Sequence, residues 1–288
     1  MSDDKGTPGT VRKKRFPATL GATVCAPTPS RKLWNTVNES PLKTQIFSVS
    51  TSQTRSQAKT NHTGMYAASS EIPLAGGMAA ARLRMVQRLR QQEIRYEGVL
   101  RAMGNVPREL FVDSALVNQA YEDTSLPIGL GQTISKPSVV ARMIELLVPE
   151  NGVKLGRVLD VGTGCGYQAA VLSQLVDEVY SIERLKGLHE RARVNLRPLR
   201  LKNVHLIYGD GMQGFPSGAP YDAIIAAAGG ENVPVTWLEQ LSEDGCLIAP
   251  VVTAPGVQSL IKVVRTPQGW QQYELEAVQF VPLKSGVL

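Results

Sequence analysis

The sequence has few cysteines, and none of them is placed for structural chemistry. The chain contains three among 288 residues. Cys25, Cys165 and Cys246 stand far apart, with no C-x-x-C pair. Neither a disulfide framework nor a zinc site is therefore expected, and a reducing cytoplasm fits this usage best.

Histidine and long apolar runs are also scarce. His62, His189 and His205 show no metal-ligand spacing, so no metal ion is expected. One of the longest apolar runs, residues 223–228, falls well short of the roughly 20 residues that cross a bilayer. We expect no membrane span.

Net charge is absent from most of the chain, although the whole carries +6. Residues 1–75 hold ten Lys and Arg against four Asp and Glu, while residues 76–288 hold 21 of each kind. The basicity belongs to the N-terminal segment. A nucleic-acid footprint on the remainder is therefore not expected.

Residues 1–75 are rich in Ser, Thr and Pro, and their apolar residues have no period. Such a composition buries too little surface to offset its ordering entropy, which predicts a disordered basic tail. The basic run 12–15 precedes residues 16–21, which are too broken for a secretory signal. The basic run could instead touch acidic partners. Translation that starts at Met65 or Met78 is another alternative.

The folded part is expected from residue 76 to residue 288. Apolar residues at spacings of three to four predict a helix over 78–103. Residues 123–131 are interpreted as a loop. Pro137 suits the first turn of a helix that continues through residue 147.

From residue 157 the pattern changes to strands that alternate with helices. This rhythm predicts a doubly wound α/β domain with a mostly parallel, seven-stranded Rossmann-like sheet and helices on both faces. A turn signal at 266–269, with no helix beside it, predicts an antiparallel C-terminal strand. The expected strands are 158–161, 178–182, 204–208, 221–227, 246–252, 258–264 and 271–280, and the helices between them are 167–176, 188–199 and 235–241.

Glycines and acidic residues coincide with the carboxyl ends of the first three strands. Gly162, Gly164 and Gly166 follow the first strand, where ligands bind in open α/β sheets. Glu183 ends the second strand, where a carboxylate can accept hydrogen bonds from ribose hydroxyls. Asp210 follows the third. Because all three strand ends carry such residues, a nucleoside-binding site is favoured over a glycine turn that only packs a helix close to the strand.

A dinucleotide is the rival ligand, but its loop favours G-x-G-x-x-G and faces a pyrophosphate. Here the spacing is G-x-G-x-G followed by Tyr167. S-adenosylmethionine carries a sulfonium cation and no phosphate, and acidic groups such as Asp160 suit it. The residues favour a methyltransferase core around Val161–Tyr167.

The chain from about residue 106 to residue 283 resembles the protein-L-isoaspartate O-methyltransferase family. The loop at 161–167 alone marks a methyltransferase superfamily, whereas Gly131–Pro137 upstream is far more specific to this family. The matching segments are 106–112, 120–123, 131–137, the glycine loop and 280–283.

The resemblance implies methylation of the free α-carboxylate of L-isoaspartyl residues in damaged proteins and peptides. It assigns Ser135 to the active site and Thr133, Ile134 and Ser138 to the substrate. Residues 78–147 would form the substrate side, and residues 153–288 the cofactor-binding sheet core. The expected cofactor-binding residues are Asp160, Gly162, Thr163, Gly164, Gly166, Glu183, Asp210 and Gly211.

Several alternatives stay open from the residues alone. Ser135, two residues before Pro137, is also a candidate helix cap. Cys165 and Ser138 depart from many relatives, which leaves substrate affinity open. The core could act on RNA or a small molecule, or bind the cofactor without catalysis. We expect a monomer that binds neither nucleic acid nor membranes through its folded domain.

Overall fold

The computed structural model describes residues 75–149 and 153–288. These residues lie within one compact unit, Ala67–Leu288. The predicted basic tail lies outside the described residues. In the described part of the chain, no helix is both long and apolar enough to span a bilayer.

A seven-stranded sheet forms the centre of the molecule, in the order β5-β4-β3-β6-β7-β8-β9. The first five strands in this order pair in parallel, and β8 and β9 are added as antiparallel hairpins, which confirms the predicted sheet. The chain leaves β3 toward β4 and β5, then returns to β6 on the other side of β3. The switch point of the sheet therefore lies at the end of β3. The strands are β3 (Arg157–Val161), β4 (Glu178–Glu183), β5 (Val204–Tyr208), β6 (Tyr221–Ala226), β7 (Leu241–Ala254), β8 (Val257–Thr266) and β9 (Gly269–Val278).

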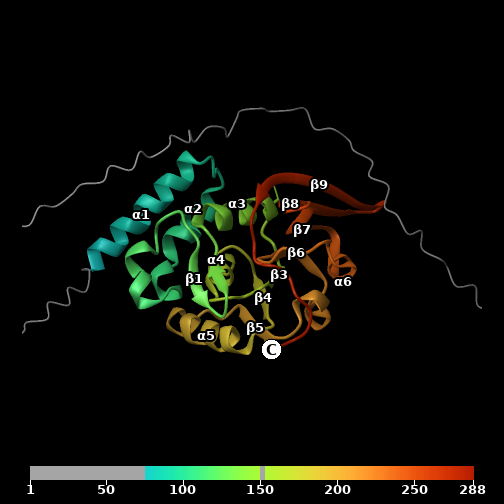
Figure 1. Cartoon of the computed structure of the whole chain (residues 1–288). Coiled ribbons are helices and arrows are strands. Elements are labelled where there is room, and N and C mark those ends of the chain that lie inside the picture. Colours follow the sequence, from blue (N-terminus) through green and yellow to red (C-terminus); the bar gives the residue numbers. More distant parts are fainter. Residues whose placement is uncertain (1–74, 150–152) are drawn as a thin grey trace, which may run out of the picture. The chain divides into compact units, whose positions relative to one another are not determined.

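Helices cover the two faces of the sheet unequally. One core cluster joins five helices to side chains such as Val158 and Ile225, whereas the other joins Trp237 of the last helix to Leu159 and Ile224. Both faces of β3 and β6 are buried, as expected for parallel strands. The helices α1, α2 and α3 pack against one another (Figure 1). The helices are α1 (Ala75–Gln91), α2 (Glu97–Asn105), α3 (Pro137–Leu147), α4 (Tyr167–Leu172), α5 (Lys186–Leu196) and α6 (Val235–Gln240).

Short 3-10 segments connect these elements. They precede the first small ribbon, follow α5, and bridge β5 to β6. Their bounds are η1 (Arg108–Phe111), η2 (Ser114–Gln119), η3 (Arg197–Leu199), η4 (Gly211–Gln213) and η5 (Pro216–Gly218).

The N-terminal helical region differs from the prediction in two places. The helix expected over 78–103 is broken between α1 and α2, where Glu93 takes a left-handed conformation (φ 67°) that ends α1. The loop expected over 123–131 contains half of an antiparallel ribbon, β1 (Leu126–Gly129) with β2 (Gln132–Ile134). Strands of four and three residues are too short for their alternation to identify them in the sequence.

One helix boundary and one helix cap also differ from the prediction. The helix expected over 167–176 ends at Leu172 and continues only as turns. Pro137 is the first residue of α3, as predicted, but the N-cap residue is Lys136 and not Ser135. Ser135 therefore lies in the segment before the helix, and the helix-cap interpretation is wrong.

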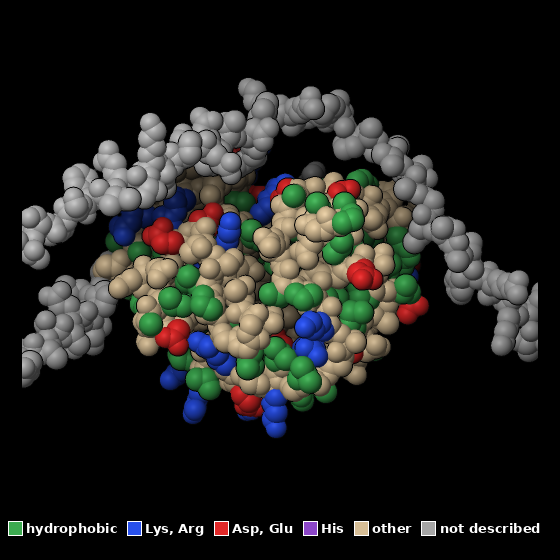
Figure 2. All heavy atoms as spheres, in the orientation of Figure 1, with side chains coloured by type: hydrophobic (Ala, Val, Ile, Leu, Met, Phe, Trp, Pro, Cys, Tyr) green, Lys and Arg blue, Asp and Glu red, His purple; other side chains and the backbone are tan. Residues whose placement is uncertain are grey.

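Arginines gather on α1, although the folded part as a whole is neutral. Figure 2 shows the Lys and Arg side chains over this helix, which has no acidic residue in its first turn. Most of these arginines are engaged within the molecule. Arg82 bonds to Tyr121, Arg88 to the carbonyl of Tyr121, and Arg90 to Glu97. The cluster therefore stabilises the helical region internally.

Candidate active site

A cavity of about 240 Å³ opens at the carboxyl ends of the central strands. Four parts of the chain form its wall: the β1–β2 ribbon with the residues after it, the glycine loop, the ends of β4 to β6, and the C-terminal segment. The lining residues are Ile128, Leu130, 132–135, Val140, 161–165, Tyr167, Gln168, 182–185, Leu188, Gly211, Ala227, Ala228, 281–284 and Leu288.

The glycine loop takes the conformation that its sequence predicts. Gly162, Gly164 and Gly166 all have positive φ, at 94°, 56° and 94°. A Cβ at Gly164 would also lie only 3.2 Å from the side chain of Ile128, which belongs to strand β1 of the ribbon. Glycine at this position therefore permits both the turn and the close approach of the ribbon.

Glu183 braces this loop from the end of β4. One carboxylate oxygen accepts the Gly164 N–H at 2.9 Å and the other accepts the Leu185 N–H at 2.9 Å. Each oxygen keeps a further lone pair, and the residue lines the cavity. Glu183 is therefore placed to accept hydrogen bonds from a ligand while it holds the loop.

Asp160 lies beneath the loop and outside the cavity wall. Its Oδ1 accepts from Gln168 at 2.8 Å and its Oδ2 from the Ser181 hydroxyl at 2.7 Å. Ser181 is in turn 2.7 Å from the Thr163 hydroxyl. Burial raises the pKa of Asp160 to about 6, against the hydrogen bonds that lower it. Asp160 thus reaches the cavity through Thr163 and Gln168, which line it.

Asp210 also has partners within the chain. Its Oδ1 accepts the Met212 N–H at 2.9 Å, and its Oδ2 accepts the Gly286 N–H at 2.7 Å. The neighbouring Gly211 lines the cavity, and its carbonyl accepts from Trp237 at 2.7 Å. The predicted third strand end therefore contributes Gly211 to the wall, while Asp210 anchors the C-terminal segment.

Of the substrate-side residues assigned by resemblance, some line the cavity and one lies outside its wall. Thr133, Ile134 and Ser135 line the cavity. Ser138 lies in the first turn of α3, outside the wall, and its N–H donates to Asp123 at 2.9 Å. Gly166 also lies outside the wall, as the N-cap residue that precedes α4.

The hydroxyl of Ser135 has no hydrogen-bond partner among the residues that the structure describes. Its carbonyl, by contrast, accepts from Arg108 at 2.7 Å. The main chain of Ser135 is thus fixed while its side chain is available to a ligand in the cavity.

The Cys165 thiol, which lines the cavity, is poorly suited to nucleophilic catalysis. Burial raises the pKa of the Cys165 thiol, which therefore stays protonated near neutral pH. Within residues 75–149 and 153–288, no three His, Cys, Asp or Glu side chains are grouped to hold a metal ion. The groups that line the cavity are therefore suited to binding and orienting a ligand.

The C-terminal segment forms a wall that the sequence did not predict beyond Leu283. Leu288 donates to the Arg184 carbonyl at 2.8 Å, and its own carbonyl accepts from Lys186 at 2.7 Å. Arg184 in turn donates to the carbonyls of Gly286 and Ser285. In Figure 1 the C-terminus accordingly lies beside the start of α5. Long-range backbone hydrogen bonds of this kind leave no periodic signal in a sequence.

The class of protein follows from the glycine loop at the switch point and from the acidic residue at the end of the next strand. Together with the G-x-G-x-G spacing and the antiparallel C-terminal hairpins, these features are those of a Rossmann-like methyltransferase.

Comparison with known proteins narrows the class. The family model described as protein-L-isoaspartate (D-aspartate) O-methyltransferase matches residues 80–288. A protein-L-isoaspartate O-methyltransferase from Leptothrix cholodnii is 62% identical over 208 residues, which cover 71% of this chain and 74% of the relative. One from Burkholderia pseudomallei is 54% identical over 230 residues, covering 78% and 71%. The chain belongs to the protein-L-isoaspartate O-methyltransferase family.

Solved structures agree with this assignment. One protein-L-isoaspartate O-methyltransferase superimposes with a TM-score of 0.65 at 28% identity, covering 72% of this chain and 67% of that one. A Plasmodium falciparum chain described as a methyltransferase of the same kind was solved with S-adenosyl-L-homocysteine. It gives a TM-score of 0.60 at 25% identity and covers 70% and 98%. The predicted family, fold class and enzyme class are confirmed.

Proposed function

We propose that the cavity binds S-adenosylmethionine and that Ser135 holds the α-carboxylate of an L-isoaspartyl residue beside it. The observation that carries this proposal is the unpaired Ser135 hydroxyl, which lines the same cavity as Gly162, Gly164 and Glu183. The family acts on isoaspartyl-containing proteins, and the Plasmodium relative binds the demethylated cofactor. When bound, S-adenosylmethionine supplies a methyl group already activated by its sulfonium.

The residues of the wall fit this cofactor. Glu183 has free lone pairs for hydroxyl donors, and Gly162 and Gly164 leave room for close approach. Thr163 and Gly211 complete the same side of the wall. Asp160, Gly166 and Asp210 support these residues from behind.

The reaction requires little acid–base chemistry from the chain. A substrate carboxylate is already ionised at neutral pH, so no general base is needed. The residues around the cavity would orient the carboxylate and exclude water. Thr133 and Ile134 extend the substrate side of the wall from β2.

Incubation with a labelled methyl donor tests the proposal. An isoaspartyl peptide should yield a base-labile methyl ester, and the matching aspartyl peptide should not. Equal labelling of both peptides would contradict the substrate assignment.

Ser135→Ala should lower kcat by roughly 10- to 100-fold, because an oriented hydrogen bond to the reacting group is lost. The Kd for S-adenosyl-L-homocysteine, measured by calorimetry, should change little. Ser217→Ala, an exposed serine in η5, is the matched control. Wild-type turnover in Ser135→Ala would remove Ser135 from the active site.

We also infer a monomer in a reducing compartment. The edge strand β9 exposes Gln271, Gln272 and Glu274, and such polar side chains disfavour pairing between sheet edges. Cys165 and Cys246 are free thiols. Sedimentation at assay concentrations tests the monomer.

A further inference from the structure

Arg108 is a buried cation at the junction of the substrate side and the cofactor side. Its residue is 0% exposed in η1. Its Nε donates to the Ala120 carbonyl at 2.7 Å, and its Nη2 donates to the Ser135 carbonyl at 2.7 Å. Its guanidinium carbon lies 4.6 Å from the centroid of the Tyr167 ring, which follows the glycine loop. One side chain therefore joins the segment that holds Ser135 to the start of α4.

No carboxylate forms a salt bridge with Arg108 in the described chain, although the Asp123 carboxylate makes a small electrostatic contribution that favours its charged form. Three other arginines of this region do have carboxylate partners: Arg82 with Glu109, Arg90 with Glu97, and Arg142 with Glu276. The Nη1 of Arg108 is buried and has no hydrogen-bond partner in the part of the chain that the structure describes.

A buried charge of this kind is unfavourable unless something offsets it. Burial indeed lowers the pKa of the guanidinium, although the group stays protonated because its ordinary pKa is so high. The face of Tyr167 offsets part of the cost. The hydrogen bonds to the Ala120 and Ser135 carbonyls serve the fold but do not neutralise the charge, so the buried cation favours a ligand of opposite sign.

We propose that Arg108 is a positioning residue that fixes Ser135 against Tyr167 and whose charge favours an anionic group at Ser135. This inference rests on the proposed function, in which that group is the isoaspartyl α-carboxylate. The guanidinium bonds to the carbonyl of Ser135, so an anion held by the hydroxyl of the same residue would lie close to the positive charge. The protein around them screens charges less than water does. Arg108 thereby contributes to the choice of a carboxylate over a neutral carboxamide.

The test compares the wild type with Arg108→Met, which keeps volume without charge, and with Arg108→Lys, which keeps charge without the fork of donors. Enzyme saturated with S-adenosyl-L-homocysteine cannot methylate, so Kd values are measured at equilibrium for an isoaspartyl peptide and for its α-carboxamide analogue. Turnover of the isoaspartyl peptide is measured separately. Arg82→Met, which removes a carboxylate-paired arginine from the same region, is the matched control.

Arg108→Met should reduce the preference for the carboxylate peptide by about tenfold, with the Kd for S-adenosyl-L-homocysteine unchanged. Arg108→Lys should keep the preference within about threefold but lower kcat by about tenfold, because Ser135 is held less firmly. Arg82→Met should keep the wild-type preference.

An unchanged preference in folded Arg108→Met overturns the role of the charge. If Arg108→Met does not fold, Arg108→Lys decides: preserved preference with reduced kcat supports the proposal, and wild-type kcat overturns it. Failure of the wild type to methylate the isoaspartyl peptide would instead contradict the proposed function, so the two failures are distinguishable.

Discussion

Asp160 shows how a residue can support the wall of a cavity without lining it. The carboxylate is fully buried, yet its hydrogen bonds to Gln168 and Ser181 fix two side chains around the glycine loop. Because burial dominates, the pKa of Asp160 rises to about 6 from its ordinary value of 3.8. The folded protein therefore binds a proton more tightly than the unfolded chain does.

Asp160 should make the stability of the fold depend on pH. The folded pKa is raised, so the stabilisation is fully present below about pH 4 and is lost as pH rises through about 6. A shift of about two units corresponds to roughly 3 kcal/mol. Asp160→Asn does not titrate, so the wild type should lose about this much relative to the variant between pH 4 and pH 7.5. Urea unfolding at both pH values measures it, and a pH-independent difference would contradict the argument.

At the scale of elements, the segment after β9 is held by one side chain that bonds to both backbone groups of a residue, as a neighbouring strand would. Gln258 of β8 accepts the Phe280 N–H at 2.7 Å and donates to the Phe280 carbonyl at 3.3 Å. Beyond Phe280, Val281 and Leu283 bond to the main chain of Gly229. These contacts place the C-terminal wall against the cavity.

Gln258→Met should weaken cofactor binding, because both hydrogen bonds to Phe280 are lost at similar side-chain volume. We expect the Kd for S-adenosyl-L-homocysteine to rise by about tenfold. Titration calorimetry measures it, with Gln272→Met on the exposed edge of β9 as the matched control. Equal Kd values in the two variants would show that the wall does not depend on Gln258.

The sheet could be predicted because its central parallel strands, β3 and β6, are buried on both faces and are rich in apolar residues. The glycine loop and Glu183 were predictable for a related reason, since the end of each strand fixes where they lie. The β1–β2 ribbon and the Leu288 contacts were not, because they depend on hydrogen bonds between distant segments. Ser135 and its neighbours were located by family resemblance, and the residues alone had left a helix cap open.

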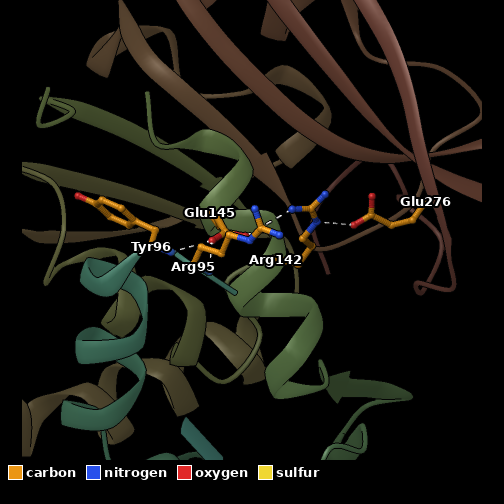
Figure 3. Close-up of polar contacts among 5 residues, drawn as sticks. All are labelled: Arg95, Tyr96, Arg142, Glu145 and Glu276. Carbon is orange, nitrogen blue, oxygen red and sulfur yellow. Dashed lines mark hydrogen bonds and ion pairs between the residues drawn. The ribbon is translucent and has the colours of Figure 1, made fainter. Parts of the chain in front are cut away.

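At the scale of the whole molecule, Glu145 joins three parts of the fold. One oxygen accepts the N–H groups of Arg95 and Tyr96, at 2.7 and 2.8 Å, just before α2. The other lies 3.4 Å from Arg142, which bonds to Glu276 of β9 at 2.8 Å. Figure 3 shows this row of side chains running from the start of α2 across α3 to the edge strand.

Glu145→Ala should lower the free energy of unfolding by about 2 kcal/mol, because two N–H groups at a helix start lose a charged acceptor. Glu276→Ala should lower it by less than about 1 kcal/mol, since that pair is exposed. Urea unfolding gives both values. Neither variant should change the KM for the isoaspartyl peptide, and a raised KM in Glu145→Ala would mean that α3 transmits the change to Ser135.

The contacts of residues 281–288 have a consequence for synthesis. The glycine loop and the parallel strands leave the ribosome long before the wall that these residues form. A nascent chain can pair β3 with β4 and β6 while its cavity is still open on one side, because domains begin to fold before translation ends. The wall is then complete only after residues 281–288 have bonded to Arg184, Asp210 and Gly229. A chain without residues 281–288 would therefore form the sheet but leave the cavity open on one side.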